Sequence, residues 1–283
     1  MKLHSLLLAT SVLAATAGVA AAEVTLSGDA RMGITNNNSA NDWQFTSRAR
    51  VKFTMSGTTD GGLEFGASFR ANNATSAANG TAGEVYISGA FGRLAMGDVD
   101  GAAQAAVGQV DGVGLTGLGD QNEIDYALGE PDPSMLYSYT TGQMTFYLSA
   151  EQPADGTGGT NDAYGAGFKW ATDQYSFAIG YEDDGGIDVR QTTVGGSVTF
   201  SGVTLKAIYA DSNDLDGDQY AFSASGTFSG VGVTAFYNED LDGETAYGLG
   251  ASYDLGGGAK VMGGVVDSSD NDTVADFGVS FSF

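Results

Sequence analysis

The chain ends in the stretch Ala275-Asp276-Phe277-Gly278-Val279-Ser280-Phe281-Ser282-Phe283, in which apolar and polar residues alternate. In an extended strand, successive side chains point to opposite faces of the sheet. One face of this stretch is therefore apolar and ends on a phenylalanine, whereas the other carries only an acid, a glycine and two serines. The pattern predicts a two-faced β-strand, and the same texture recurs along most of the sequence.

Runs with this alternation come in pairs, separated by tight turns rich in glycine, aspartate or asparagine. Such pairs are typical of consecutive β-hairpins. In residues 43–55, for example, Phe45 and Val51 share one face, whereas Arg48 and Arg50 share the other. Counting the runs predicts 16 antiparallel strands, with 14 or 18 as the alternatives.

So many strands without a long helical pattern predict a closed all-β barrel, because an open sheet would leave unpaired edges. We expect a transmembrane antiparallel β-barrel whose apolar faces meet lipid and whose polar faces line a wet interior. Within hydrocarbon, closure is obligatory because no water satisfies an open edge. A barrel of this size has room for an aqueous channel. Short links alternate with longer acidic ones, which is typical of short periplasmic turns and longer external loops.

Residues 1–22 are predicted to be a cleaved signal peptide, which leaves residues 23–283 as one barrel domain. Lys2 gives a basic start, residues 6–20 are an apolar run, and three alanines precede Glu23. We therefore expect export to the outer membrane of a Gram-negative bacterium. The formal net charge of −24 argues against nucleic acid as a partner.

The composition excludes several classes of enzyme. The sole histidine is His4, inside the predicted signal peptide, and cysteine is absent, so common catalytic pairs and ordinary zinc ligands are missing from the exported chain. The GxGxxG pattern at 112–117 follows no strand and opens no helix, so it predicts no dinucleotide site. We expect no catalytic residue, no metal site and no required cofactor. Calcium on the acidic loops at 214–218 and 239–244 is an alternative, although the first lacks the full EF-hand pattern.

Residues 100–134 interrupt the rhythm of strands. A stretch of this length without regular structure is typically functional or disordered. We expect it to fold into the barrel and narrow the lumen, and a flexible external loop is the alternative. The acidic residues of this region are Asp98, Asp100, Asp111, Asp120, Glu123, Asp125, Glu130 and Asp132.

Basic residues are distributed unevenly, and none lies between Leu94 and Phe168. Most of those in the exported chain precede the acidic stretch, namely Arg31, Arg48, Arg50, Lys52, Arg70 and Arg93. Strand alternation places the first five on the polar faces of three successive strands. Because like charges repel, such a wall needs water or an opposing acidic cluster. We expect a transverse field between this wall and the loop, and simple pairing with acids of the lumen is the alternative.

Several stretches resemble the porins of photosynthetic and related alphaproteobacteria, of the Rhodobacter type. They are residues 23–33 (EVTLSGDARMG), 42–69 (DWQFTSRARVKFTMSGTTDGGLEFGASF), 87–98 (ISGAFGRLAMGD), 247–259 (YGLGASYDLGGGA) and the terminal Phe283. The resemblance implies a homotrimeric, 16-stranded outer-membrane channel whose third external loop folds inside. It also implies that Arg31, Arg48, Arg50 and Arg70 line the constriction.

The resemblance further implies that Phe283 is read by the barrel-assembly machinery, and that the termini meet with Glu23 near Phe283. Outer-membrane lipid, lipopolysaccharide and small hydrophilic solutes are the remaining expected partners. The predicted function is a general-diffusion porin for small solutes and ions. A channel selective for a saccharide or an anion is one alternative, and a filled barrel with a structural or adhesive role is the other.

Overall fold

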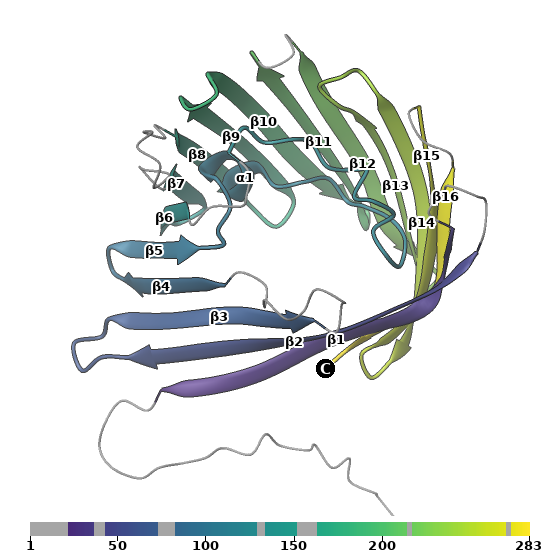
Figure 1. Cartoon of the computed structure of the whole chain (residues 1–283), viewed down its shortest axis with the longest axis horizontal. Coiled ribbons are helices and arrows are strands. Elements are labelled where there is room, and N and C mark those ends of the chain that lie inside the picture. Colours follow the sequence, from purple (N-terminus) through teal and green to yellow (C-terminus); the bar gives the residue numbers. More distant parts are fainter. Residues whose placement is uncertain are drawn as a thin grey trace, which may run out of the picture.

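The computed structural model describes residues 22–36, 43–72, 83–128, 134–151, 163–213, 217–269 and 273–283. They form sixteen strands and the short helix α1 (Ala102–Val107) (Figure 1). The strands are β1 (Glu23–Asn36), β2 (Gln44–Thr58), β3 (Glu64–Asn72), β4 (Glu84–Gly89), β5 (Gly92–Gly97), β6 (Ser134–Thr141), β7 (Met144–Ala150), β8 (Ala163–Ala171), β9 (Tyr175–Asp184), β10 (Val189–Phe200), β11 (Val203–Ser212), β12 (Asp218–Phe228), β13 (Val231–Glu239), β14 (Thr245–Gly256), β15 (Ala259–Ser268) and β16 (Val274–Ser282).

The strands form a closed antiparallel barrel, which confirms the predicted fold and the count of 16. Each strand pairs with its neighbours in sequence, and β1 closes the ring by pairing with both β2 and β16. At this seam, the amide of Phe283 donates to the carbonyl of Gly28 at 2.9 Å. The expected meeting of the termini in one strand pair is confirmed, because β1 pairs with β16. The register places Phe283 beside Gly28, so Glu23 itself lies further along β1 and not next to Phe283.

The two faces of the strands differ as the alternation predicts. Large apolar side chains are exposed on the outside, with Phe45 96% and Phe200 79% accessible. Polar side chains such as Gln191 and Gln219 are instead buried inside the barrel, where they contact the segment after β5. A soluble barrel would bury its apolar face, so the exterior of this one is suited to lipid.

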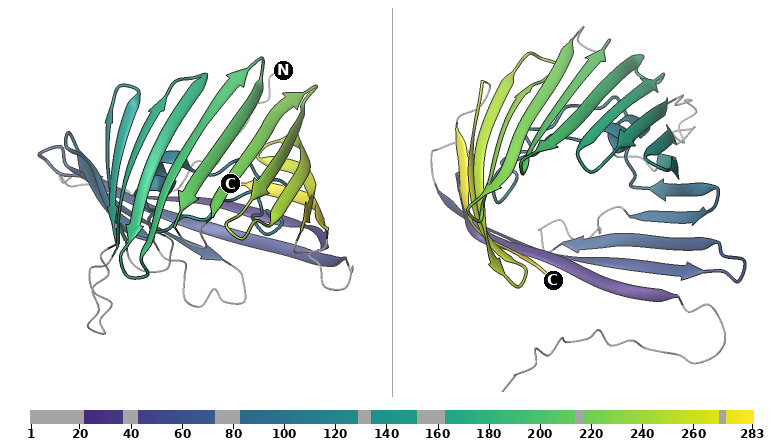
Figure 2. Two further views of the ribbon diagram at one scale, coloured as in Figure 1. Left: turned by 90° about the horizontal axis from the view of Figure 1, so that it is seen from above. Right: turned by 180° about the vertical axis from the view of Figure 1, so that it is seen from behind.

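Residues 98–128, called the inward loop below, run inside the barrel along its inner surface (Figures 1 and 2). The hydrophobic core lies between this loop and the strands: Val110, Val113, Leu118 and Ile124 pack against residues of β11 to β15, among them Ile208 and Phe236. The predicted in-folded loop is therefore confirmed over these residues, and the alternative of a flexible external loop is wrong. Residues 129–133 and the predicted signal peptide up to residue 21 lie outside the described residues.

The height of the barrel wall varies around the ring. Strands β1 and β2 have 14 and 15 residues, whereas β4 and β5 have 6 each. The lowest part of the wall is therefore on the side of β4 and β5, away from the long strands β10 to β15 (Figure 2). Within the described part of the chain, no helix is long and apolar enough to cross a bilayer.

Candidate functional site: the lumen and its inward loop

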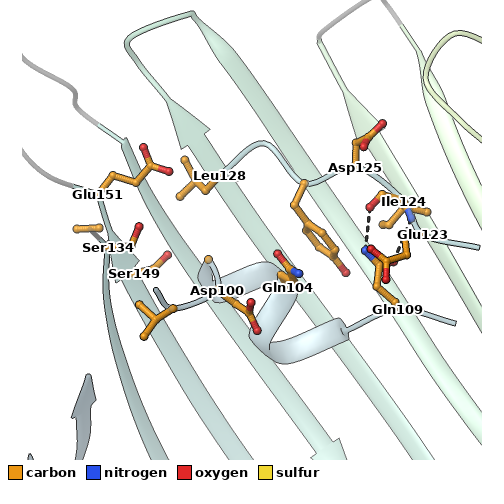
Figure 3. A pocket seen from close by; sticks show the side chains of 14 residues that line it. Asp100, Gln104, Gln109, Glu123, Ile124, Asp125, Leu128, Ser134, Ser149 and Glu151 are labelled. Atoms are coloured by element: carbon orange, nitrogen blue, oxygen red, sulfur yellow. Dashed lines mark hydrogen bonds between the residues drawn. The ribbon is translucent and has the colours of Figure 1, made fainter. Parts of the chain in front are cut away.

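The inward loop doubles back on itself, with an outgoing arm at 108–114 and a return arm at 122–128. The two arms are joined by side chains that bind backbone groups across the gap. Gln109 donates to the carbonyl of Ile124 at 2.9 Å and accepts from the amide of Ile124 at 3.0 Å (Figure 3). Asn122 donates to the carbonyl of Val110 at 2.8 Å. The backbone groups of the two arms have no partner in a neighbouring strand, and these side chains satisfy their hydrogen bonds instead. The loop therefore has a fixed conformation although it is not part of the sheet.

Helix α1 begins the loop and packs on the inner faces of β7 to β10. It can lie this close because glycines of β8 and β9 lie directly beneath it. A Cβ atom placed on Gly180 would lie 2.3 Å from the Cβ of Ala103, and one on Gly167 would lie 2.3 Å from the carbonyl oxygen of Ala102. The glycines of β8 and β9 therefore set the distance between the helix and the wall.

Buried carboxamides hold the return arm. Gln219 of β12 accepts from the amide of Asp125 at 2.8 Å and donates to its carbonyl at 2.6 Å. Gln191 of β10 donates to the same carbonyl at 2.8 Å and accepts from the amide of Ala127 at 3.0 Å. Asn238 of β13 donates to the carbonyl of Glu123 at 3.0 Å. The arm is thus bound through its backbone, as an extra strand would be.

The tip of the loop is fixed at the seam of the barrel. Asp276 of β16 accepts from the amides of Leu115 and Thr116 at 2.8 and 2.6 Å. Arg31 of β1 donates to the carbonyl of Leu115 at 3.3 Å. The loop therefore follows the inner wall from β9 to β16 and β1.

Two further side chains hold the ends of the loop: Ser149 accepts from the amide of Ala102 at 2.8 Å, and Glu182 accepts from the amide of Leu128 at 3.0 Å. Sequence reasoning missed all of these anchors. Polar positions on the lumen face carry no local feature that distinguishes an anchor from a residue in contact with water; the anchors are Ser149, Glu182, Gln191, Gln219, Asn238 and Asp276. One feature of the sequence could have found them: each except Ser149 is a single longer polar side chain on a strand face that otherwise consists mainly of glycine, alanine, serine and threonine.

Five of the predicted basic residues come together as expected. Register places Arg31 beside Arg48, and Lys52 beside Arg70, on adjoining strands β1 to β3. Asp29 lies among them and accepts two bonds from Arg50, each of 2.9 Å, and a longer one from Arg48 at 3.5 Å. We call Arg31, Arg48, Arg50, Lys52 and Arg70 the basic wall. The five cations outnumber the acids that the structure shows to act on them, namely Asp29 and, for Arg31, also Asp276 and Asp120.

Arg93 does not belong to this group. It lies on β5, where its guanidinium stacks 4.4 Å from the ring centroid of Tyr86 and forms an ion pair of 2.9 Å with Glu84. Pairing with a local carboxylate, the alternative to a field, applies to Arg93 through Glu84, and Arg48 and Arg50 share the carboxylate of Asp29.

The acids of the loop divide in the same way. Asp111 points to the wall behind the loop, where it binds Lys206 at 2.6 Å and Ser225 at 2.9 Å. Five others are exposed, namely Asp98, Asp100, Asp120, Glu123 and Asp125. Asp120 lies within electrostatic range of Arg31. Glu130 and Asp132 lie outside the described residues.

The exposed acids are crowded. Loss of solvent, aided by Asp98, raises the pKa of Asp100. Loss of solvent also raises the pKa of Glu123, with Asp120 and Asp125 adding to it, and that of Asp125, where Asp240 and Asp242 contribute. These carboxyls take up protons at a higher pH than isolated ones.

A recess of about 360 Å³ opens between α1, the return arm and the ends of β6 and β7 (Figure 3). Asp100, Glu123, Asp125 and Glu151 line it together with Gln104 and Tyr126. Among the residues that the structure describes, no group of three or more acids is arranged to hold a metal ion. The recess is a wet, acidic part of the lumen. Calcium on the acidic loops at 214–218 and 239–244 stays an untested alternative, and residues 214–216 lie outside the described residues.

Comparisons with known proteins agree with this architecture. A family model described as Gram-negative porin matches residues 9–273. The porin of Rhodobacter capsulatus is 38% identical over 92% of this chain and the whole of that protein. The porin of Fuscovulum blasticum is 28% identical over the same shares.

Solved structures show the same likeness. A porin structure refined at 1.8 Å resolution superposes with a TM-score of 0.82 at 36% identity, covering 92% of this chain and all of that one. A variant of the Rh. blastica porin superposes with a TM-score of 0.75 at 25% identity, with the same coverage.

Proposed function

Because the chain belongs to the Gram-negative porin family, a family of outer-membrane channels without enzymatic activity, we propose that it is a general-diffusion channel for small hydrophilic solutes and ions. The proposal includes a transverse field at the constriction, between the basic wall and the exposed acids of the inward loop. The observation that carries it is the gathering of five cations on β1 to β3 while Asp111 and Arg93 are neutralised elsewhere.

The physical argument concerns water between the two charged surfaces. Charges of opposite sign across a narrow aqueous gap orient water, and an apolar solute must displace that ordered water to pass. A dipolar solute can align with the field, so its free-energy cost of displacing the ordered water is smaller. Arginine keeps its charge at all relevant pH values, so the basic side of the field persists.

The test removes two charges from the basic wall. We expect the double variant Arg48→Gln and Arg50→Gln to shift the reversal potential in a salt gradient toward cation selectivity, because the acids of the loop then dominate the lumen. The matched control is Arg190→Gln, since Arg190 is half-exposed and pairs with Asp183 and Asp188 at the external rim. Equal reversal potentials in the parent and the double variant would contradict the proposed field.

The same recordings separate general diffusion from selectivity. A general pore gives a conductance that rises linearly with salt and does not saturate with one sugar. Saturation by a single saccharide or anion would instead support a selective site. A barrel that conducts nothing would support the filled, structural alternative.

We also propose that the chain assembles as a homotrimer through the low side of its wall. A transmembrane strand needs about 9–11 residues. Strands β4 and β5 have 6 each, so they are too short to face a full layer of lipid. Their outer faces are nonetheless apolar, with Val85 63% and Ile87 39% exposed. A second copy of the chain is a surface that could cover this region.

The oligomer is tested by mass in detergent. We expect the parent to have the mass of three chains and the variant Val85→Arg with Ile87→Arg to release monomers. Leu249→Arg, on the tall side at β14, is the control because it puts the same charge on an exposed apolar face. A parent of one chain's mass would refute the homotrimer.

Two expectations about export and assembly complete the proposal. Removal of residues 1–22 is supported by the basic start, the apolar run and the alanines before Glu23. Phe283 stays the predicted signal for the barrel-assembly machinery. It is 82% exposed at the end of β16, where a receptor could reach it.

A further inference from the structure

Glu182 of β9 is a carboxylate that the channel itself does not explain. Its side chain is 0% exposed because the inward loop covers it, so a solute in the lumen cannot reach it. Among the described residues, no ion pair joins it to a cation. A buried charge is costly unless hydrogen bonds compensate it, so a carboxylate at this position calls for a specific partner.

That partner is the neck of the inward loop, where the loop leaves the wall and returns to it. One carboxylate oxygen, Oε1, accepts from the amide of Ala103 at the start of α1 at 3.2 Å. The other, Oε2, accepts from the amide of Leu128 at the end of the return arm at 3.0 Å. A single side chain therefore holds both ends of the loop against the same strand.

The chemistry of the three long anchors is matched to what each one faces. Gln191 and Gln219 each meet one amide and one carbonyl of the return arm, and a carboxamide can accept from the first and donate to the second. Glu182 meets two amides. Only a group that accepts at both ends satisfies two donors, and an ionised carboxylate is such a group.

We propose that Glu182 is the positioning residue that closes the neck of the inward loop and so fixes the width of the constriction. The inference rests on the proposed channel function, because the neck matters only if solutes pass the loop. Glu182 touches no solute. It acts through the backbone of Ala103 and Leu128.

The test is the near-isosteric variant Glu182→Gln. Its NH₂ group would face one of the two amides, donor against donor, so one end of the neck would be released while the packing is kept. The matched control is Asp183→Asn, which removes one charge from the next residue. Asp183 binds Tyr181 at 3.1 Å and Arg190 at 3.2 Å, and neither residue belongs to the loop.

The first readout is amide hydrogen exchange in peptides that contain Ala103 and Leu128. We expect exchange at one or both sites to rise about tenfold in Glu182→Gln, the factor implied by loss of a hydrogen bond to a charged group. Asp183→Asn should leave both unchanged. Unchanged exchange in a folded Glu182→Gln barrel would overturn the inference.

The second readout is the single-channel current. Glu182→Gln should show more open-channel noise or a wider sub-state, whereas the control should match the parent. If the glutamine variant does not assemble, Glu182→Asp replaces it, because the shorter side chain keeps the charge but cannot reach both amides. A quiet current of parental size in a conducting variant would overturn the inference. A silent parent would refute the proposed channel, and exchange would still test the neck.

Discussion

The inner wall of the barrel has two regions that differ in the size and charge of their side chains. On β7 to β16, where the inward loop lies, the wall offers glycines and single anchors such as Gln191, Gln219 and Asp276. On β1 to β3, it offers the long cations of the basic wall. Both regions are lumen-facing positions of the same kind of strand. The difference teaches that a covered wall fits the backbone closely and binds its charged groups to the loop, as Glu182, Lys206 and Asp276 show. An open wall can gather charges of one sign because water solvates them.

Deleting the inward loop should have the largest effect, because it would remove the difference between the covered and the open wall. Deletion of residues 101–130 should leave all sixteen strands in place and expose the anchors of the covered wall to water. We expect conductance to rise roughly twofold or more, because current grows with the open cross-section. The measurement is single-channel conductance of a variant that keeps parental β-structure by circular dichroism. An unchanged conductance would mean that the loop does not narrow the pore.

A single methyl group should disturb the covered wall without touching the open one. In Gly180→Ala the new Cβ would lie 2.3 Å from the Cβ of Ala103, so α1 must move away from β9. We expect a loss of about 1–3 kcal/mol in stability, the usual penalty of overpacking. Denaturant unfolding measures it.

Gly61→Ala is the control for that experiment, because a Cβ at Gly61 would meet only the Oγ1 of Thr59, at 3.9 Å. If both glycine variants unfold at the same denaturant concentration, close packing of the helix on β9 is not what holds the loop.

The smallest effect is expected from pH, which acts on the acids of the loop and spares the basic wall. Because the pKa values of Asp100, Glu123 and Asp125 are raised, these carboxyls lose their charge early as the pH falls. Selectivity should therefore drift toward anions as the pH falls, starting above the ordinary carboxyl range near about pH 4. Reversal potentials measure this drift, and it should be flatter in Glu123→Gln with Asp125→Asn. An equal slope in that variant would assign the drift to other acids.

Strand alternation predicted the barrel and the basic wall correctly, since the positions of Arg48 and Arg50 follow from a period of two alone. The two-residue alternation of side chains does not apply to residues in a loop. Asp111 was grouped with the lumen acids, yet it turns to Lys206, because the direction of a loop side chain depends on how the backbone is anchored. Those anchors are long-range contacts. Gln219 binds Asp125 at a separation of 94 residues, which no local pattern reports.

The anchoring of the loop tip has a consequence for the order of biogenesis. Asp276 lies on the last strand, 161 residues beyond the amide of Leu115 that it binds. This contact cannot form before β16 is in place, and closing so long a stretch of chain costs conformational entropy. The aperture therefore cannot reach its final size until the C-terminal strand has docked and the cylinder has sealed. A partly assembled barrel would have a wider and more permeable lumen than the finished one. Closure of the barrel and positioning of the loop tip therefore occur in the same step of assembly.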